Sequence, residues 1–220
     1  MKKYNETNEL LPSTTTKSRK RKRINSIIIH TTGYGKGLER IEKKCDGDLA
    51  LAGKMYAERM AKILRYKGHF LLDHTGMIYQ FLDLDDIAWH TGGGKKRRLK
   101  IEEPFEWWTE RWKGIVDKPT DLPSWDSRPN NISIGIDLLA FSNGPHFPNH
   151  YTELQIESLA RLVGSLCKDY NIPLDRKHIV GHEDVDPISR GRKKGGWDPG
   201  RKFDWDYFMA ALGVLSDANI

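Results

Sequence analysis

Apolar and polar residues alternate along the chain with two different periods, which separate predicted strands from predicted helices. The run INSIIIH at 24–30 is short and rich in β-branched residues, as a buried strand is. In 49–66 the apolar residues recur at helical spacing instead, which predicts a helix. Thr152 followed three residues later by Gln155 is a capping-box pattern, and it predicts the start of an amphipathic helix over 152–170.

The remaining segments complete an alternating order of strands and helices. The turn HTG at 74–76 is flanked by apolar runs and predicts a β-hairpin. The segment GYGKGLERIEKKCDGD at 33–48 has the composition of a loop. Further predicted elements are a central strand at 131–141, a short strand at 178–182 and a closing helix at 203–215. The order β-α-β-β-β-α-β-α predicts an α/β fold with a mixed central sheet flanked by helices.

Two segments do not fit this core. Residues 95–130 are too long for a plain connector, and such loops in a compact domain tend to be functional or disordered. Their four tryptophans indicate that part of this insertion folds against the body. We therefore expect a basic, disordered tail at 1–23 and one domain at 24–220 that contains the insertion.

Composition bounds the class of protein. With 220 residues, 38% hydrophobic and 30% charged, the chain resembles an ordinary soluble protein. No apolar run approaches the roughly 18–20 residues that span a bilayer, so we expect no membrane span. The N-terminus has no apolar segment after its lysines, which argues against a secretory signal peptide. Cys45 and Cys167 have no metal-like spacing and are expected to be free thiols.

The net charge of +6 is concentrated in the tail. Residues 1–23 hold eight Lys/Arg and two Glu, which leaves 28 basic and 28 acidic residues in the rest of the chain. A run such as KSRKRKR at 17–23 is usually a solvated arm, and when it has a partner the partner is a polyanion: nucleic acid, anionic lipid or wall polymer.

Histidines recur at the ends of predicted strands, and two of them suggest metal chemistry. A single histidine in such a place is more often a hydrogen-bonded structural residue. His30 and His182, however, end two different strands, and Asp198 follows in a tight DPG turn. Two histidines and an aspartate are ligands of the kind Zn²⁺ takes in catalytic sites, with a fourth position left for water. The long, irregular spacing leaves both interpretations open.

Five motifs in order resemble the zinc-dependent N-acetylmuramoyl-L-alanine amidases. This family includes phage lysozyme-like amidases, bacterial recycling amidases and the peptidoglycan recognition proteins. The resemblance covers Ile24 to Leu212 and is interrupted mainly by residues 95–130. Its motifs are IIIHTT, GHFLLDHTGMIYQFLDLDDIAWHTG, NNISIGIDLL, HIVGHEDV and DPGRKFDW.

The resemblance implies a fold and a set of zinc ligands. The fold is a mixed central sheet flanked by helices, with a zinc cleft at the strand ends. His30, His182 and Asp198 take the positions of the family's zinc ligands. Asp137, in SIGID, stands where many amidases have a catalytic glutamate, so its implied role is to take a proton from the attacking water.

Further positions match the substrate groove. In AWHTG, the resemblance places His90 in the groove lining, with Trp89 packed beneath it, and we assign Thr91 to the same substrate-binding group. His69 matches the histidine in the strand before the hairpin, and we interpret it as structural rather than catalytic.

Two departures from the family pattern affect the catalytic groups. Asp137 is one methylene shorter than the usual glutamate, so it must lie closer to the reacting atoms or act through water. Many relatives also have a lysine two residues before the aspartate ligand, as an oxyanion donor. That position is Gly196 here, and we expect Lys193 or Lys194 to fold back to the same point if any lysine has this role.

The resemblance therefore implies a Zn²⁺-dependent peptidoglycan hydrolase that cleaves the amide between N-acetylmuramic acid and L-alanine. The basic tail and the aromatic insertion favour a lytic, endolysin-like enzyme that is made in the cytoplasm and reaches the wall without a secretory signal. The alternatives are a cytosolic amidase that recycles soluble muropeptides and a non-catalytic peptidoglycan-binding module. Nucleic acid is a weak candidate partner because the neutral body has no recognised nucleic-acid module.

Overall fold

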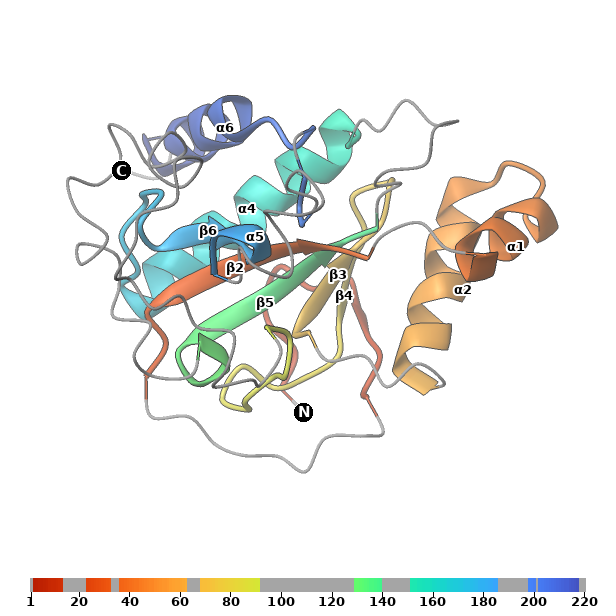
Figure 1. The fold of residues 1–220 in the computed structure, drawn as a ribbon, viewed down its shortest axis with the longest axis horizontal. Coiled ribbons are helices and arrows are strands. Elements are labelled where there is room, and N and C mark those ends of the chain that lie inside the picture. Colours follow the sequence, from red (N-terminus) through yellow and green to blue (C-terminus); the bar gives the residue numbers. More distant parts are fainter. Residues whose placement is uncertain are drawn as a thin grey trace, which may run out of the picture.

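The computed structural model places one β-sheet at the centre of the chain, with helices on both faces (Figure 1). The structure describes residues 2–13, 23–32, 36–62, 68–91, 129–139, 151–185, 198–200 and 202–217. Within these residues six strands pair in the order β1-β4-β3-β5-β2-β6. The strands are β1 (Glu9–Leu10), β2 (Ser26–Thr31), β3 (Phe70–Leu72), β4 (Ile78–Gln80), β5 (Ser133–Leu138) and β6 (Ile179–Gly181).

Strand β2 is an interior strand of the sheet. It pairs in parallel with β5 over six residues on one side and with β6 on the other. Strand β3 pairs in parallel with β5 and antiparallel with β4. The predicted mixed sheet is therefore confirmed. Nearly every residue of β2 and β5 is buried, including their polar residues Ser26, His30 and Ser133.

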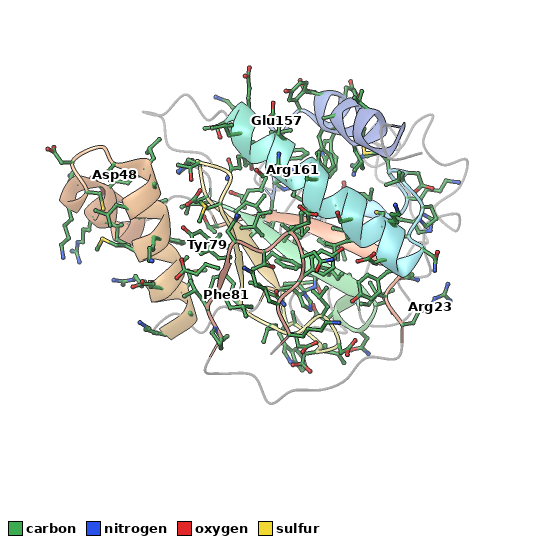
Figure 2. The ribbon with its side chains drawn as sticks, turned by 180° about the vertical axis from the view of Figure 1, so that it is seen from behind. Arg23, Asp48, Tyr79, Phe81, Glu157 and Arg161 are labelled. Carbon is green, nitrogen blue, oxygen red and sulfur yellow. The ribbon has the colours of Figure 1, made fainter. Side chains whose placement is uncertain are left out.

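One face of the sheet is covered by α4 (Glu153–Tyr170) and α6 (Trp205–Asp217). Figure 2 shows α4 crossing this face, with the exposed Glu157 and Arg161 on its outer side. Alternate strand residues point into the layer beneath, because successive side chains of a strand face opposite ways. The apolar core under α4 and α6 includes Ile27, Ile29, Phe70, Leu72, Ile134, Ile136, Leu138, Leu159, Leu162 and Phe208.

The start of α4 is capped as predicted, but only half of the capping box forms. Thr152 is the N-cap, and its Oγ1 accepts a hydrogen bond from the Gln155 amide at 3.1 Å. The Gln155 side chain does not return to Thr152. Its Nε2 instead donates to the carbonyls of Leu72 and Leu139, both at 3.0 Å, and so fastens α4 to the sheet.

The opposite face is covered in part by α1 (Lys36–Lys44) and α2 (Leu49–Lys62), which form a pair beside β3 and β4 (Figure 1). The prediction of a loop over 33–48 is wrong for α1. Leu38, Ile41 and Cys45 form a narrow buried stripe at helical spacing, and charged residues between them mask it in the sequence. Near β2 and β5 the same face carries polar side chains instead.

The N-terminal segment is structured over residues 2–13, so the prediction of a disordered tail is wrong for this part. Strand β1 pairs in parallel with β4 at the edge of the sheet. The buried Gln80 side chain accepts hydrogen bonds from the Tyr4 amide at 2.8 Å and from Thr7 Oγ1 at 2.9 Å. The N-terminal residues therefore complete one edge of the sheet, whereas 14–22, with most of the basic run, lie outside the described residues.

Two other sequence predictions fall mainly outside the described residues. Of the insertion 95–130, only 129–130 are described, and they belong to the 3₁₀ turn η3 (Pro129–Asn131) that leads into β5. Among the helices of the described residues, none combines the length and apolar character needed to cross a bilayer.

Candidate functional site

The sheet brings the two predicted histidine ligands together. His30 is near the end of β2, and His182 directly follows β6 as the first residue of the short helix α5 (His182–Val185). Because β2 and β6 are parallel neighbours, their carboxyl ends lie at the same edge of the sheet. Asp198 lies beside both histidines, and all three residues are at most 3% exposed.

Three lone-pair atoms converge on one point in this cluster. His30 Nδ1 lies 3.1 Å from His182 Nδ1, which lies 2.9 Å from Asp198 Oδ2. One ligand atom from each residue falls within 4.8 Å of the other two, and no other group of this kind occurs among the described residues. A single proton on His182 Nδ1 cannot serve both neighbours, whereas a cation accepts lone pairs from all three. The donor set therefore fits a metal ion such as Zn²⁺.

The Asp198 carboxyl is held in its charged form. Burial alone would raise its pKa, but the interactions with His182 and His30 outweigh burial and hold the pKa of Asp198 well below its usual range. Its other oxygen, Oδ1, accepts a hydrogen bond from the Thr31 amide at 2.9 Å. One oxygen is thus fixed by the backbone of β2, 3.7 Å from His30 Nδ1, and the other lies 2.9 Å from His182 Nδ1.

Glu183 and Arg176 attach the ligand-bearing segments to the sheet. The Glu183 amide donates to the Asp198 carbonyl at 2.8 Å, and the fully buried Glu183 carboxylate accepts from the Asp198 amide at 3.3 Å. Arg176 donates to the carbonyl of Ile179 in β6 and to the Asp184 carboxylate. Its guanidinium also lies 3.3 Å from the centre of the Trp205 ring.

Asp137 lies next to this cluster. It is opposite His30 in the register of β5 and β2, so the two side chains share a face of the sheet. Asp137 is only partly buried, in contrast to the three converging residues. The pKa of Tyr56, on α2, is raised by burial, lowered by a hydrogen bond with Thr32 and raised further by the Asp137 charge, with a net rise. Asp137 therefore borders the cluster of His30, His182 and Asp198 without belonging to it.

His90 contacts the cluster directly. Its Nδ1 lies 2.8 Å from His30 Nε2, the ring nitrogen that faces away from His182, and its Nε2 lies 3.1 Å from Ser133 Oγ. The ring lies against Gly135 of β5. Trp89, expected beneath His90, is 40% exposed, and its place beneath the ring stays a prediction.

The structure also describes the surroundings of Thr91 and His69. Thr91 is 4% exposed, and its amide and hydroxyl both donate to Asn130 Oδ1 at 2.9 Å, so its side chain anchors η3 rather than facing a substrate. His69 is fully buried; its Nδ1 accepts from the Gly135 amide at 3.0 Å and its Nε2 lies 3.1 Å from the Asp86 carbonyl. His69 is therefore structural, as interpreted from the sequence. Lys193, Lys194 and Gly196 lie outside the described residues.

Sequence reasoning missed Ser133, Gly135 and Glu183. The signal for the first two was present, because SIGIDL alternates small or polar residues with apolar ones, and the period of a strand puts Ser133, Gly135 and Asp137 on one face. Glu183 had no such signal, since a buried carboxylate that holds a backbone amide is indistinguishable in sequence from a surface one.

Comparisons with known proteins agree with this geometry. The family model described as N-acetylmuramoyl-L-alanine amidase matches residues 20–201. The curated protein 1,6-anhydro-N-acetylmuramyl-L-alanine amidase AmpD of Haemophilus influenzae is 27% identical over 150 residues, which cover 68% of this chain and 60% of that protein. The AmpD protein of Enterobacter cloacae is 29% identical over 150 residues, covering 68% and 59%. The match thus spans about 60% of the length of these curated relatives.

Solved structures share the fold. A selenomethionine derivative of AmpD superposes with a TM-score of 0.54 at 20% identity, covering 95% of this chain and 96% of that one. The PlyG catalytic domain has a TM-score of 0.54 at 13% identity, covering 94% of each chain. At these identities the likeness shows the fold alone, and it agrees with the mixed sheet flanked by helices expected from the sequence.

Proposed function

The chain belongs to the N-acetylmuramoyl-L-alanine amidase family, and from this we propose that it hydrolyses the amide between the lactyl group of N-acetylmuramic acid and L-alanine of the stem peptide, using Zn²⁺. The observation that carries the proposal is the convergence of His30, His182 and Asp198 on one point at the carboxyl ends of β2 and β6. Their chemistry is that of a catalytic zinc site with three protein ligands.

The ligands would be His30 Nδ1, His182 Nδ1 and one oxygen of Asp198. A bound Zn²⁺ would supply a Lewis acid that polarises the amide carbonyl and makes water more acidic. The residues around the site keep the donors in place: Thr31 and Glu183 fix Asp198, and β2 and β6 fix the histidines. Such support orients ligands before the metal arrives.

Asp137 is our candidate for the proton-transfer group. Its place beside His30 puts a carboxylate next to the cluster, and its partial exposure leaves room for water and substrate. The carboxylate accepts a proton from the attacking water and passes it to the leaving amine of L-alanine. The side chain is a methylene shorter than glutamate, so a bridging water completes the reach.

The oxyanion formed at the carbonyl needs a donor, and Lys193 or Lys194 is proposed for this role on the sequence alone. Removal of an oxyanion donor costs about 100-fold or more in turnover. Alanine at both positions together should reach that loss, measured with a soluble muropeptide. A loss below threefold would assign the role to another group.

The test of the function uses two substrates, purified sacculi and a soluble 1,6-anhydromuropeptide, each with and without chelator and with zinc added back. We expect release of the peptide with a free L-alanine amine, loss of activity on chelation and its return with zinc. Asp198→Ala should bind no zinc and be inactive. Asp137→Asn should keep zinc but lose about 100- to 10,000-fold in turnover, because an amide cannot accept the proton.

Outcomes of this experiment separate the alternatives. A protein that binds peptidoglycan but cleaves neither substrate in the presence of zinc would be a binding module, and the proposal would be wrong. Near-normal activity in Asp137→Asn would remove this residue from catalysis. Zinc retained in Asp198→Ala would overturn the ligand assignment.

The two substrates also distinguish the biological settings. The names of the curated relatives, 1,6-anhydro-N-acetylmuramyl-L-alanine amidases, favour a substrate that carries a 1,6-anhydro-N-acetylmuramyl group. The basic run at 17–23 favours attraction to anionic wall polymers and a lytic role. Replacing its six Lys/Arg with Gln should weaken binding to sacculi at low salt and leave soluble-substrate turnover unchanged. Equal wall binding by both proteins would remove the tail from substrate recognition.

A further inference from the structure

We infer that His90 is a positioning residue that fixes the proton of His30, so that His30 presents a lone pair to the metal. This assigns His90 a role on the side of the ligand away from the metal, in addition to any contact with substrate. The inference rests on the proposed metal site and deepens it. Its central observation is the 2.8 Å contact between His30 Nε2 and His90 Nδ1.

The argument starts at a backbone carbonyl, where the direction of hydrogen bonding is fixed. Ser133 Oγ lies 2.7 Å from the Pro129 carbonyl, which can only accept, so the Ser133 hydroxyl donates its one proton there. With that proton used, Ser133 Oγ must accept in its contact with His90 Nε2 at 3.1 Å. The proton of a neutral His90 ring is therefore on Nε2.

The same reasoning gives the position of the proton on His30. Since His90 has its proton on Nε2, its Nδ1 is a lone pair and accepts from His30 Nε2. His30 in turn carries its proton on Nε2, and its Nδ1 is a lone pair. That nitrogen is the one that faces His182 Nδ1 at 3.1 Å and belongs to the converging donors. The Pro129 carbonyl thus selects, through Ser133 and His90, the form of His30 that can bind a metal.

The His90 ring occupies the space that the missing side chain of Gly135 leaves over the sheet. A Cβ on Gly135 would lie 2.5 Å from His90 Cγ and 2.6 Å from His90 Nδ1, closer than side-chain carbons approach other heavy atoms. Ser133 precedes Gly135 by two residues on the same face of β5 and is fully buried. Strand β5 therefore supplies both the acceptor for His90 and the gap that the ring fills.

The expected consequence is a change in metal affinity. Partners that bond the far nitrogen of a ligating histidine typically contribute about 10- to 100-fold to metal affinity. His90→Leu removes the acceptor and should lower zinc affinity by about that factor. His90→Asn places an amide oxygen near the position of Nδ1 and should recover most of the affinity, which a purely space-filling role would not predict.

The experiment measures zinc affinity of the full chain by competition with a chromophoric chelator, without substrate. His178→Leu is the matched control, because His178 is a partly buried histidine near β6 that bonds Asp175 at 2.7 Å. It should bind zinc as the unchanged protein does. Wild-type affinity in His90→Leu, or no recovery in His90→Asn, would overturn the inference.

A second measurement works on the metal-free protein and separates this inference from the proposed function. Long-range ¹H–¹⁵N spectra of histidine-labelled protein should show the Nε2–H form for both His30 and His90. Ser133→Ala should change the His90 signals, whereas Ser26→Ala, an equally buried serine opposite Ser133 in β2, should not. An Nδ1–H form of His30 would overturn the inference even if zinc binds. A protein that shows the expected forms but binds no zinc would instead contradict the proposed function.

Discussion

Adding one methyl group to Gly135 should weaken metal binding without removing any polar atom. In Gly135→Ala the new Cβ would lie 2.5 Å from His90 Cγ, whereas ordinary contact begins at 3.4 Å. The ring must then move by about 0.9 Å (3.4 − 2.5). Strand β5 is held on both sides by its pairing with β2 and β3. The His90 side chain therefore moves, and the backbone of β5 does not.

A shift of this size is enough to break the contact with His30. If it lies along the 2.8 Å bond between His30 Nε2 and His90 Nδ1, the distance becomes about 3.7 Å, which exceeds the roughly 3.2 Å limit of an N–H···N or N–H···O bond. We therefore expect zinc affinity to fall by about 10- to 100-fold, or about 1.4–2.7 kcal/mol. Crowding in the core should also lower the free energy of unfolding by about 1–3 kcal/mol.

The assay is the same chelator competition, with Gly164→Ala as control, since a Cβ there meets only Leu212 at an ordinary 3.5 Å. The decisive comparison is made with His90→Ala, which removes the ring. In that background Gly135→Ala has room and should cause no further loss of affinity, so the two effects should not add. Wild-type affinity in Gly135→Ala, or equal losses with and without the His90 ring, would refute the reasoning.

Three further predictions concern the fold. Thr152→Ala removes the cap of α4 and a hydroxyl that donates to the His74 carbonyl at 2.6 Å, and should lower the free energy of unfolding by about 1–2 kcal/mol in urea titrations. Burial raises the pKa of Cys167 to about 12, so about one molecule in ten thousand carries the thiolate at pH 8, and a thiol reagent should modify this residue only after unfolding. Deleting residues 2–13 removes three hydrogen bonds of the Gln80 side chain, which alone should cost about 3 kcal/mol, and equal urea midpoints would contradict this.

The core of the fold could be predicted from the sequence because its signals are local. Strand β2, helix α4 and the hairpin of β3 and β4 each carry their own period, cap or turn. Two of the missed elements, α1 and β1, lack such signals. Helix α1 is mostly charged, and its stripe of Leu38 and Ile41 is too sparse to stand out. Strand β1 has two residues, and its pairing with β4, about 70 residues away, is decided by tertiary contacts.

The candidate ligands could be named from the sequence, but their surroundings could not. Position at strand ends and the family motifs both indicated His30 and His182. The link from His30 through His90 to Ser133 depends on ring orientation, which no spacing encodes. Thr91, which the sequence assigns to the substrate-binding group, is buried and bonded to Asn130, and its place in the motif does not reveal this either.

The position of β6 determines how a bound metal would leave. Within the described residues β6 lies at the edge of the sheet and pairs only with β2, over three residues, yet His182 follows it and Asp198 is tied to it through Glu183. His30, in contrast, is on a strand paired on both sides. A local opening that also breaks the bond from the Thr31 amide to Asp198 can thus separate two of the three ligands, and it is far smaller than global unfolding. The rate of metal release should then equal the rate of amide hydrogen exchange in Ile179–Gly181. The metal would be lost from molecules that are otherwise still folded.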